Sequence, residues 1–285
     1  MGTENRKGPL KDVKVLDFTI ALAGVYVAWQ FADMGAEVWK VERYGSGDQA
    51  RTWDPFVNGL STLYTAYNKN KQSIELDLSS QEGKQVIYDM VKEADVVLEN
   101  FKSGSIDRLG LGYEELKKIN PKIVFVSLSG FGATGPLKKY PCYDAIAARG
   151  GFAGSNGEPD GAPMKAGNAN CDTLTGTHAL NAALIGLIQA RKTGEGCRVD
   201  IGMMDTVMIS CGETVVDYGS SSPGFPDIRT EAAVTLSPAA PLSFSYSPQL
   251  PQHHKPPPHA PQNESHPSDR SADSRQVRHN NHPPF

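Results

Sequence analysis

A strand, a helix and a second strand within the first 43 residues constrain the fold of this chain more than any other feature. Val13–Thr19 reads Val-Lys-Val-Leu-Asp-Phe-Thr and predicts a short buried strand. An apolar stretch with helical spacing follows from Val25 to Met34, and Gly35 ends it as a helix C-cap would. Glu37–Arg43 predicts the next strand. A strand–helix–strand unit of about 30 residues pairs its strands in parallel.

The alternation of strands and helices continues along the chain. A helix is predicted to begin at a capping box formed by Ser79 and Glu82 and to run to Glu93. Further strands are predicted over residues 72–78, 95–101, 122–128 and 198–201, and further helices over 113–119, 173–191 and 203–218. This order predicts an α/β fold with a Rossmann-like parallel sheet and flanking helices.

The composition changes at residue 229. Residues 229–285 contain 11 of the 20 prolines and 6 of the 7 histidines, but no glycine, isoleucine, methionine, cysteine or tryptophan. So little apolar surface cannot offset the entropy lost on ordering, so we expect a disordered Pro/His/Ser-rich tail. Residues 9–228 are long enough to bury a sizeable core, and residues 1–8 are expected to form a flexible N-terminus.

Charge, hydropathy and cysteine usage disfavour several classes of protein. The net charge of −4 provides no basic surface for nucleic acid. No apolar run reaches 18 residues and the first nine residues are polar, so neither a membrane span nor a secretory signal is predicted. Only His178 precedes the tail, so no metal site is expected in the folded part. Reduced thiols and a cytoplasmic location are indicated by four widely spaced cysteines: Cys142, Cys171, Cys197 and Cys211.

The familiar nucleotide-binding motifs are missing. The first strand–helix turn, Thr19–Gly24, lacks the G-x-G-x-x-G fingerprint of dinucleotide sites. Tyr113 and Lys117 have the spacing of a short-chain dehydrogenase pair, but without that fingerprint a solvated helix face explains them better. Cys171 has no histidine nearby in the sequence and fits a small buried residue better than a nucleophile.

Asp172 lies directly ahead of a long apolar helix, and two interpretations of it remain open. The simpler is a helix N-cap. The other is a covalent nucleophile, because a helix N-terminus favours the ionised carboxylate. Three cations also lie near strand ends, where phosphates can bind: Arg43, Lys102 and Arg108. Ordinary surface charge explains each of the three taken singly.

An ordered set of segments resembles the family III CoA-transferases of the CaiB/BaiF type, which include formyl-CoA:oxalate and carnitine CoA-transferases. The resemblance covers roughly residues 9–228. It rests on Val13–Thr19; Met34-Gly-Ala-Glu-Val-Trp-Lys-Val-Glu-Arg43; Gly47-Asp48 with Arg51; Asn68 to Ile74 with Asn70-Lys71; Glu99-Asn100-Phe101; Leu109-Gly110 with Tyr113; Ser129-Gly-Phe-Gly-x-x-Gly-Pro136; Tyr143-Asp144; and Lys192-Thr-Gly-x-Gly196.

The resemblance implies a function and a site. Asp172 takes the place of the family's catalytic aspartate, which moves CoA between small carboxylic acids through an aspartyl anhydride and an aspartyl-CoA thioester. Acyl-CoA is then a substrate, and no permanently bound cofactor is expected. The implied CoA contacts are Ala21, Leu22, Ala23, Arg43, Leu76, Asn100, Phe101, Lys102, Arg108, Tyr143 and Asp144.

The sequence departs from the family between Tyr218 and about Arg229. Members of the family continue into a smaller domain that covers the acyl group, then return to the first domain and interlock as homodimers. Here that portion is replaced by the tail, so turnover and dimerisation are open questions. A related α-methylacyl-CoA racemase is the alternative enzyme, but Tyr143 stands where racemases carry a catalytic histidine. A non-catalytic CoA-binding remnant is the third possibility.

Overall fold

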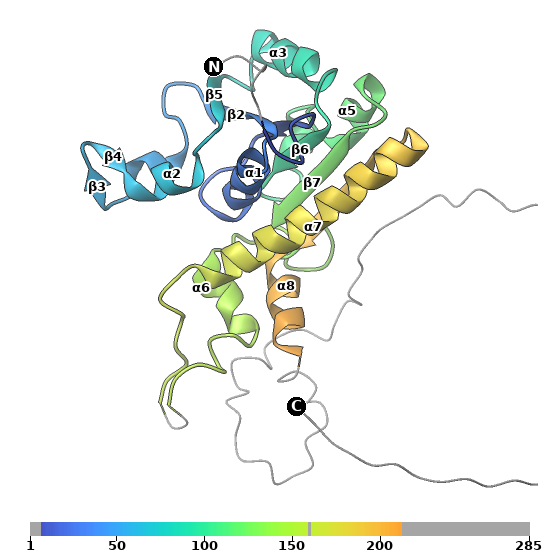
Figure 1. Cartoon of the computed structure of the whole chain (residues 1–285). Coiled ribbons are helices and arrows are strands. Elements are labelled where there is room, and N and C mark those ends of the chain that lie inside the picture. The colour runs from blue at the N-terminus through green and yellow to red at the C-terminus, as the bar shows by residue number, and fades with distance from the viewer. Residues whose placement is uncertain (1–6, 159–160, 213–285) are drawn as a thin grey trace, which may run out of the picture. The chain divides into compact units, whose positions relative to one another are not determined.

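A six-stranded parallel sheet forms the centre of the computed structural model, which describes residues 7–158 and 161–212 (Figure 1). Its order is β5-β2-β1-β6-β7-β8, and every neighbouring pair is parallel. The predicted α/β fold class is therefore confirmed. The strands are β1 (Lys14–Asp17), β2 (Glu37–Arg43), β5 (Gln72–Leu76), β6 (Val96–Glu99), β7 (Val124–Ser129) and β8 (Cys197–Gly202), with a separate antiparallel hairpin of β3 (Phe56–Val57) and β4 (Leu60–Ser61).

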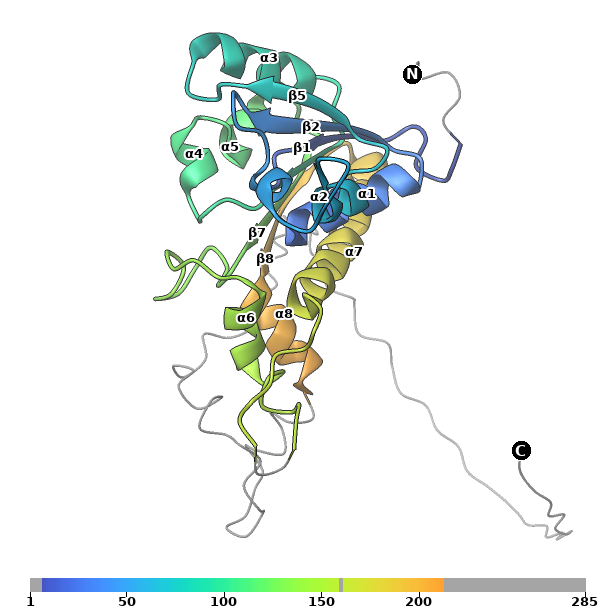
Figure 2. The same cartoon turned by 90° about the vertical axis from the view of Figure 1, so that its left-hand side faces the viewer.

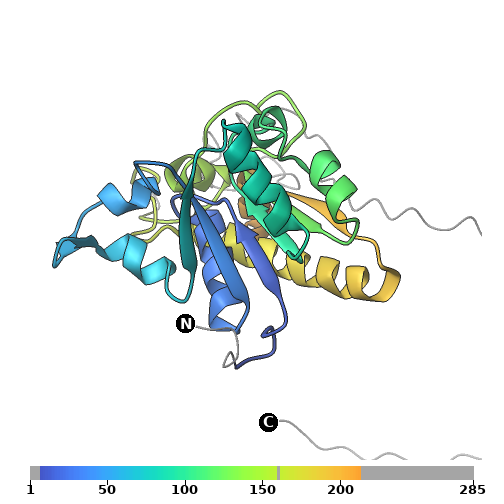
Figure 3. The same cartoon turned by 90° about the horizontal axis from the view of Figure 1, so that it is seen from above.

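Helices cover both faces of the sheet, with α1 and α7 on one face and α3 and α5 on the other (Figures 2 and 3). The α-helices are α1 (Ala23–Asp33), α2 (Thr62–Tyr67), α3 (Gln81–Val91), α4 (Ser105–Arg108), α5 (Tyr113–Ile119), α6 (Asp144–Ala147), α7 (Asn170–Thr193) and α8 (Met203–Ser210). Short 3-10 helices form at η2 (Gln49–Thr52) and η3 (Ala148–Gly150).

Successive strand residues supply the cores on the two faces. In β1, Val15 joins the cluster under α1 and α7, and Leu16 joins the cluster under α3 and α5. Val124 and Phe125 divide in the same way in β7. Side chains alternate across a strand, so a strand covered on both faces needs apolar residues at consecutive positions. That requirement explains why these strands were recognisable in the sequence.

The strand order reverses between β1 and β6. From this point the chain builds outwards, through β2 and β5 on one side and through β7 and β8 on the other. In open α/β sheets, ligands bind outside the carboxyl ends of the strands at such a switch point. The loops after β1 and β6 therefore border the expected binding crevice.

Two glycines allow close packing beside this crevice. A Cβ at Gly24, in the first turn of α1, would lie 2.4 Å from Cγ2 of Thr19. A Cβ at Gly176 would lie 2.8 Å from the carbonyl oxygen of Ala23, where α7 crosses α1. Only glycine permits these distances, so Gly24 sets how closely α1 packs on the loop after β1, and Gly176 sets how closely α7 packs on α1.

Some of the predicted element boundaries agree with the structure and others do not. Glu37–Arg43 and Tyr113–Ile119 match their predictions residue for residue. The capping box is wrong: Ser80 caps α3 by accepting the Gly83 N–H, because Asp77 engages both the backbone and the hydroxyl of Ser79.

The predicted C-terminal segments lie mostly beyond residue 212. The last helix was expected over 203–218, and the structure gives Met203–Ser210. The predicted boundary at 228 and the tail at 229–285 lie outside the described residues, as does most of the N-terminus at 1–8.

Candidate active site

A cavity of about 460 Å³ opens at the switch point of the sheet. Its walls come from the loops after β1, β6 and β7 and from the first turns of α7. The volume is in the usual range for small-molecule sites. Eight of the twelve predicted site residues line it: Ala21, Leu22, Ala23, Asn100, Phe101, Lys102, Tyr143 and Asp172.

Asn100 joins the two loops that flank the switch point. Its amide oxygen accepts the Ile20 N–H at 2.8 Å, and its amide nitrogen donates to the Ile20 carbonyl, also at 2.8 Å. Ala21, which follows Ile20 in the chain, has a φ of +65°, a conformation that non-glycine residues rarely adopt. Asn100 therefore holds a strained loop in place, a role that its predicted contact with CoA did not reveal.

A buried ion pair also holds the loop after β1. Lys40 Nζ lies 2.9 Å from Asp48 Oδ2, and both side chains are almost fully buried. Lys40 also donates to the Thr19 carbonyl at 2.8 Å, and Asp48 accepts the Ala21 N–H at 3.2 Å. A buried ion pair is tolerated only when further hydrogen bonds satisfy it, and here the loop backbone supplies them.

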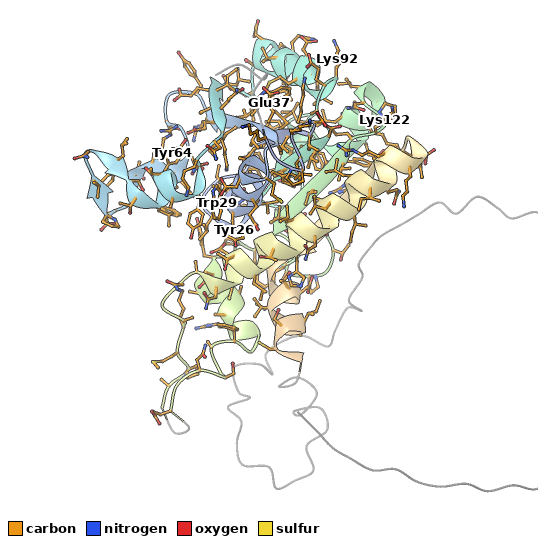
Figure 4. All side chains as sticks on the ribbon, in the orientation of Figure 1. Tyr26, Trp29, Glu37, Tyr64, Lys92 and Lys122 are labelled. Carbon is orange, nitrogen blue, oxygen red and sulfur yellow. The ribbon has the colours of Figure 1, made fainter. Side chains whose placement is uncertain are left out.

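The Asp48 segment is braced in turn by Glu42. Glu42 accepts the Asp48 N–H and a bidentate pair of hydrogen bonds from Arg51, all at 2.7 Å. Tyr64 projects from α2 and donates its hydroxyl to Glu42 at 2.8 Å (Figure 4). Burial opposes ionisation of Glu42, but these hydrogen bonds outweigh it and hold its pKa far below the usual range. The Gly47-Asp48 and Arg51 segment of the sequence thus has a structural function.

A second buried pair lies next to the first. Lys71 Nζ is 3.1 Å from Asp17 Oδ2, and both side chains are almost fully buried. Burial lowers the pKa of Lys71 to about 8, while Asp17 opposes that shift. Asp17 also accepts the Thr19 N–H at 2.9 Å, so both pairs converge on the loop that lines the cavity.

Asp172 is the third residue of α7 and faces the cavity. Its interpretation as an N-cap is wrong, because Ala169 occupies that position. The Ala23 N–H at the start of α1 interacts with the carboxyl and favours its ionised form. Burial first, and then the negative charge of Asp144, raise the pKa of Asp172 to about 7. The helix N-terminus was expected to keep Asp172 ionised, but desolvation outweighs it.

The remaining predicted residues lie outside the lining of the cavity. Arg43 and Leu76 end the neighbouring strands β2 and β5. Arg108 donates to the hydroxyl of Ser105 at 2.9 Å, and Ser105 itself lines the cavity. Asp144 is buried next to α7, where it accepts the Cys171 N–H at 2.7 Å.

Several lining residues were not predicted, among them Gln49, Lys138 and Tyr140. Lys138 supplies a second cation beside the cavity, together with Lys102. Its signal in the sequence was its position two residues after the glycine-rich loop at 130–136.

The four cysteines are free; Cys142 lines the cavity, and Cys171 directly precedes Asp172. Burial raises the pKa of Cys142 to about 11 and that of Cys171 to about 12. Both thiols are therefore protonated at neutral pH and are poor nucleophiles, as expected for Cys171. Within residues 7–158 and 161–212, no three His, Cys, Asp or Glu side chains are placed to hold a metal ion. Nor does any helix of this part have the length and apolarity to cross a membrane.

Comparison with known proteins identifies the family. The profile of CoA-transferase family III matches residues 10–242. The chain belongs to CoA-transferase family III. It is 40% identical over 233 residues to succinate–glutarate CoA-transferase of Agrobacterium fabrum, covering 79% of this chain and 58% of that protein. It is 39% identical over 216 residues to human succinyl-CoA:glutarate CoA-transferase, covering 75% and 49% respectively.

A solved structure agrees with this family assignment. The crystal structure of a CaiB/BaiF family protein from Brucella suis is 38% identical, with a TM-score of 0.72. The alignment covers 76% of this chain and 60% of that one. The chain spans about half the length of the curated relatives it matches.

Proposed function

We propose that this protein transfers coenzyme A between small carboxylic acids, with Asp172 as the covalent nucleophile. The observation that carries the proposal is the position of Asp172 in the lining of the switch-point cavity, at the start of α7. The family relationship supports the same chemistry. The names of the two relatives favour succinate and glutarate, or similar dicarboxylic acids, as the acid pair.

The proposed reaction is a series of nucleophilic substitutions at carbonyl carbons. The Asp172 carboxylate attacks the acyl-CoA thioester carbonyl, the C–S bond breaks, and an aspartyl mixed anhydride and a CoA thiolate form. The thiolate attacks the Asp172 carbonyl, which releases the first acid and leaves an aspartyl-CoA thioester. The acceptor carboxylate then attacks this thioester, and the steps reverse to give the new acyl-CoA and free Asp172. Water must be excluded, because it would hydrolyse either intermediate.

The cavity offers suitable groups for CoA. Lys102 and Lys138 are the cations in its lining and suit phosphate groups. Leu22, Phe101 and Leu109 supply apolar surface for the pantetheine chain or the adenine. Arg43 and Arg108 lie outside the lining, and we propose them for phosphates that extend beyond it.

Covalent trapping tests the proposal directly. The chain is incubated with succinyl-CoA and glutarate, hydroxylamine is added, and the Asp172 peptide is examined by mass spectrometry. We expect a hydroxamate at Asp172, glutaryl-CoA in solution, and neither with Asp172→Asn. Exchange of the α-proton of a 2-methylacyl-CoA without covalent capture would instead support the racemase. Saturable CoA binding with neither reaction would support the third possibility, a non-catalytic CoA-binding remnant.

The assembly and location are part of the same proposal. We propose a homodimer on the strength of the family relationship, to be tested by size-exclusion chromatography with light scattering. We also propose a cytoplasmic location, since the four free cysteines fit a reducing compartment.

A further inference from the structure

Helix α7, which carries Asp172, begins without a side-chain cap of its own. Its N-cap residue is Ala169, which offers no side-chain acceptor. The first N–H groups of a helix need acceptors from elsewhere. Asp144, 27 residues earlier in the chain, supplies one: its Oδ1 accepts the Cys171 N–H at 2.7 Å. A buried carboxylate from α6 thus fixes the backbone immediately before Asp172.

Lys165 secures the other oxygen of this carboxylate. Its Nζ lies 3.0 Å from Asp144 Oδ2. The same ammonium donates to the carbonyl oxygens of Ala166 at 3.0 Å and Asn168 at 3.2 Å. An ammonium has three hydrogens to donate, and three acceptors surround this one. Lys165 therefore links Asp144 to the segment that leads into α7.

We infer that Asp144 and Lys165 are a positioning pair, which seats Asp172 at the start of α7 and sets the net charge beside it. The inference rests on the proposed function only in taking Asp172 as the nucleophile. Asp144 acts on Asp172 through the Cys171 backbone and as a like charge, and Lys165 offsets that charge.

The neighbours that act on the Asp172 carboxyl with a formal charge are Asp144 and Lys165. The groups that face the carboxyl are Asp144 from α6, Lys165 from the segment that leads into α7, and the Ala23 N–H from α1. The thiols of Cys142 and Cys171 also interact with it electrostatically, but burial keeps both protonated at neutral pH.

Titration of the Asp172 carboxyl in the full chain tests the inference without any need for turnover. Carboxyl carbon-13 NMR follows the resonance, and Asp172→Asn assigns it. Lys165→Gln should raise the titration midpoint by about 0.5–1 pH unit, because it removes the positive charge that favours ionised Asp172. Asp144→Asn should lower the midpoint, since the amide keeps an acceptor for Cys171 but removes the like charge. Lys165→Arg should retain the wild-type value.

The control is Lys118→Gln, which removes an exposed pair with Glu115 on α5 and should leave the midpoint unchanged. A merely structural role would not move the midpoint in opposite directions in Lys165→Gln and Asp144→Asn. Midpoints equal to the wild type in both variants would overturn the inference. If trapping at Asp172 fails while the midpoints shift as expected, the proposed function is wrong and the positioning pair stands.

Amide hydrogen exchange provides a second measurement. Asp144→Ala should accelerate exchange of the Cys171 amide, because it removes the acceptor, and Asp144→Asn should retain protection. Unchanged exchange in Asp144→Ala would contradict the proposed seating of α7.

Discussion

At the scale of the residue, Asp172 meets two opposing requirements. A nucleophile that forms an anhydride must be shielded from water, yet shielding disfavours the ionised form that attacks. The structure shows the outcome, since burial and Asp144 raise the pKa of Asp172 to about 7. A general base matched to neutral pH would show a similar pKa, so evidence for the covalent role must come from trapping rather than from titration.

This pKa predicts how transfer depends on pH. Only ionised Asp172 can attack, so kcat/KM for succinyl-CoA should be low at pH 5 and rise through a midpoint near the pKa of about 7. Above the midpoint the rate should reach a plateau. Initial rates between pH 5 and 9 check this, with CoA binding measured at each pH as the control. A profile that is flat across the range would show that Asp172 is ionised throughout.

At the scale of the element, the loop after β1 is held by side chains. Thr19, Ile20 and Ala21 donate or accept through five backbone groups, and every partner is a side chain from another part of the chain or from Asp17. Because Ala23 lies two residues after Ala21 and its N–H interacts with Asp172, a shift of this loop would move the proposed nucleophile. Small displacements of a reacting group cost large factors in rate.

Breaking the buried pair beneath the loop should therefore affect stability and activity differently. Lys40→Met leaves Asp48 buried without its counter-charge, and should lower the free energy of unfolding by about 3–5 kcal/mol. Lys40→Met combined with Asp48→Leu should recover part of that loss, because no unpaired charge remains but three backbone groups lose their partners. Transfer should stay impaired in the double variant, since the Thr19 carbonyl and the Ala21 N–H still lack their side-chain partners. Urea unfolding and trapping at Asp172 measure the two effects.

Lys14→Met is the matched control for the single variant, since it breaks an exposed pair with Glu93. Its cost should fall within about 1 kcal/mol. A double variant that transfers CoA at the wild-type rate would show that the loop keeps its shape without these side chains.

The sequence predicted what depends on neighbouring residues and missed what depends on distant ones. Glu37–Arg43 was delimited correctly because Gly35, which ends the preceding helix, lies two residues before it. The start of α7 was misplaced because its first turn is completed by Asp144, 27 residues away from Cys171. The resemblance singled out Asp172 as the nucleophile, but nothing in the local sequence joins Lys165 to Asp144.

At the scale of the whole molecule, the buried clusters that the described residues form on both faces of the sheet lie between Val13 and Cys211. Some large apolar side chains remain exposed in the described part, including Phe56, Leu60, Ile185 and Ile188. The relatives are longer, and the family profile continues to residue 242, past the predicted boundary at 228. Composition and family membership therefore place the end of the folded part differently.

Two shortened chains decide between these boundaries. If the compositional boundary is correct, chains ending at residue 242 and at residue 228 should both unfold within about 2 °C of the full chain, because neither loses core residues. Their saturable binding of CoA should also be unchanged, since the last lining residue in the described part of the chain is Met203. If residues 229–242 pack against the fold, only the shorter chain should lose stability, and the boundary at 228 would be wrong. Thermal unfolding followed by circular dichroism distinguishes the two outcomes, because the chain ending at 242 controls for removal of the Pro/His-rich segment.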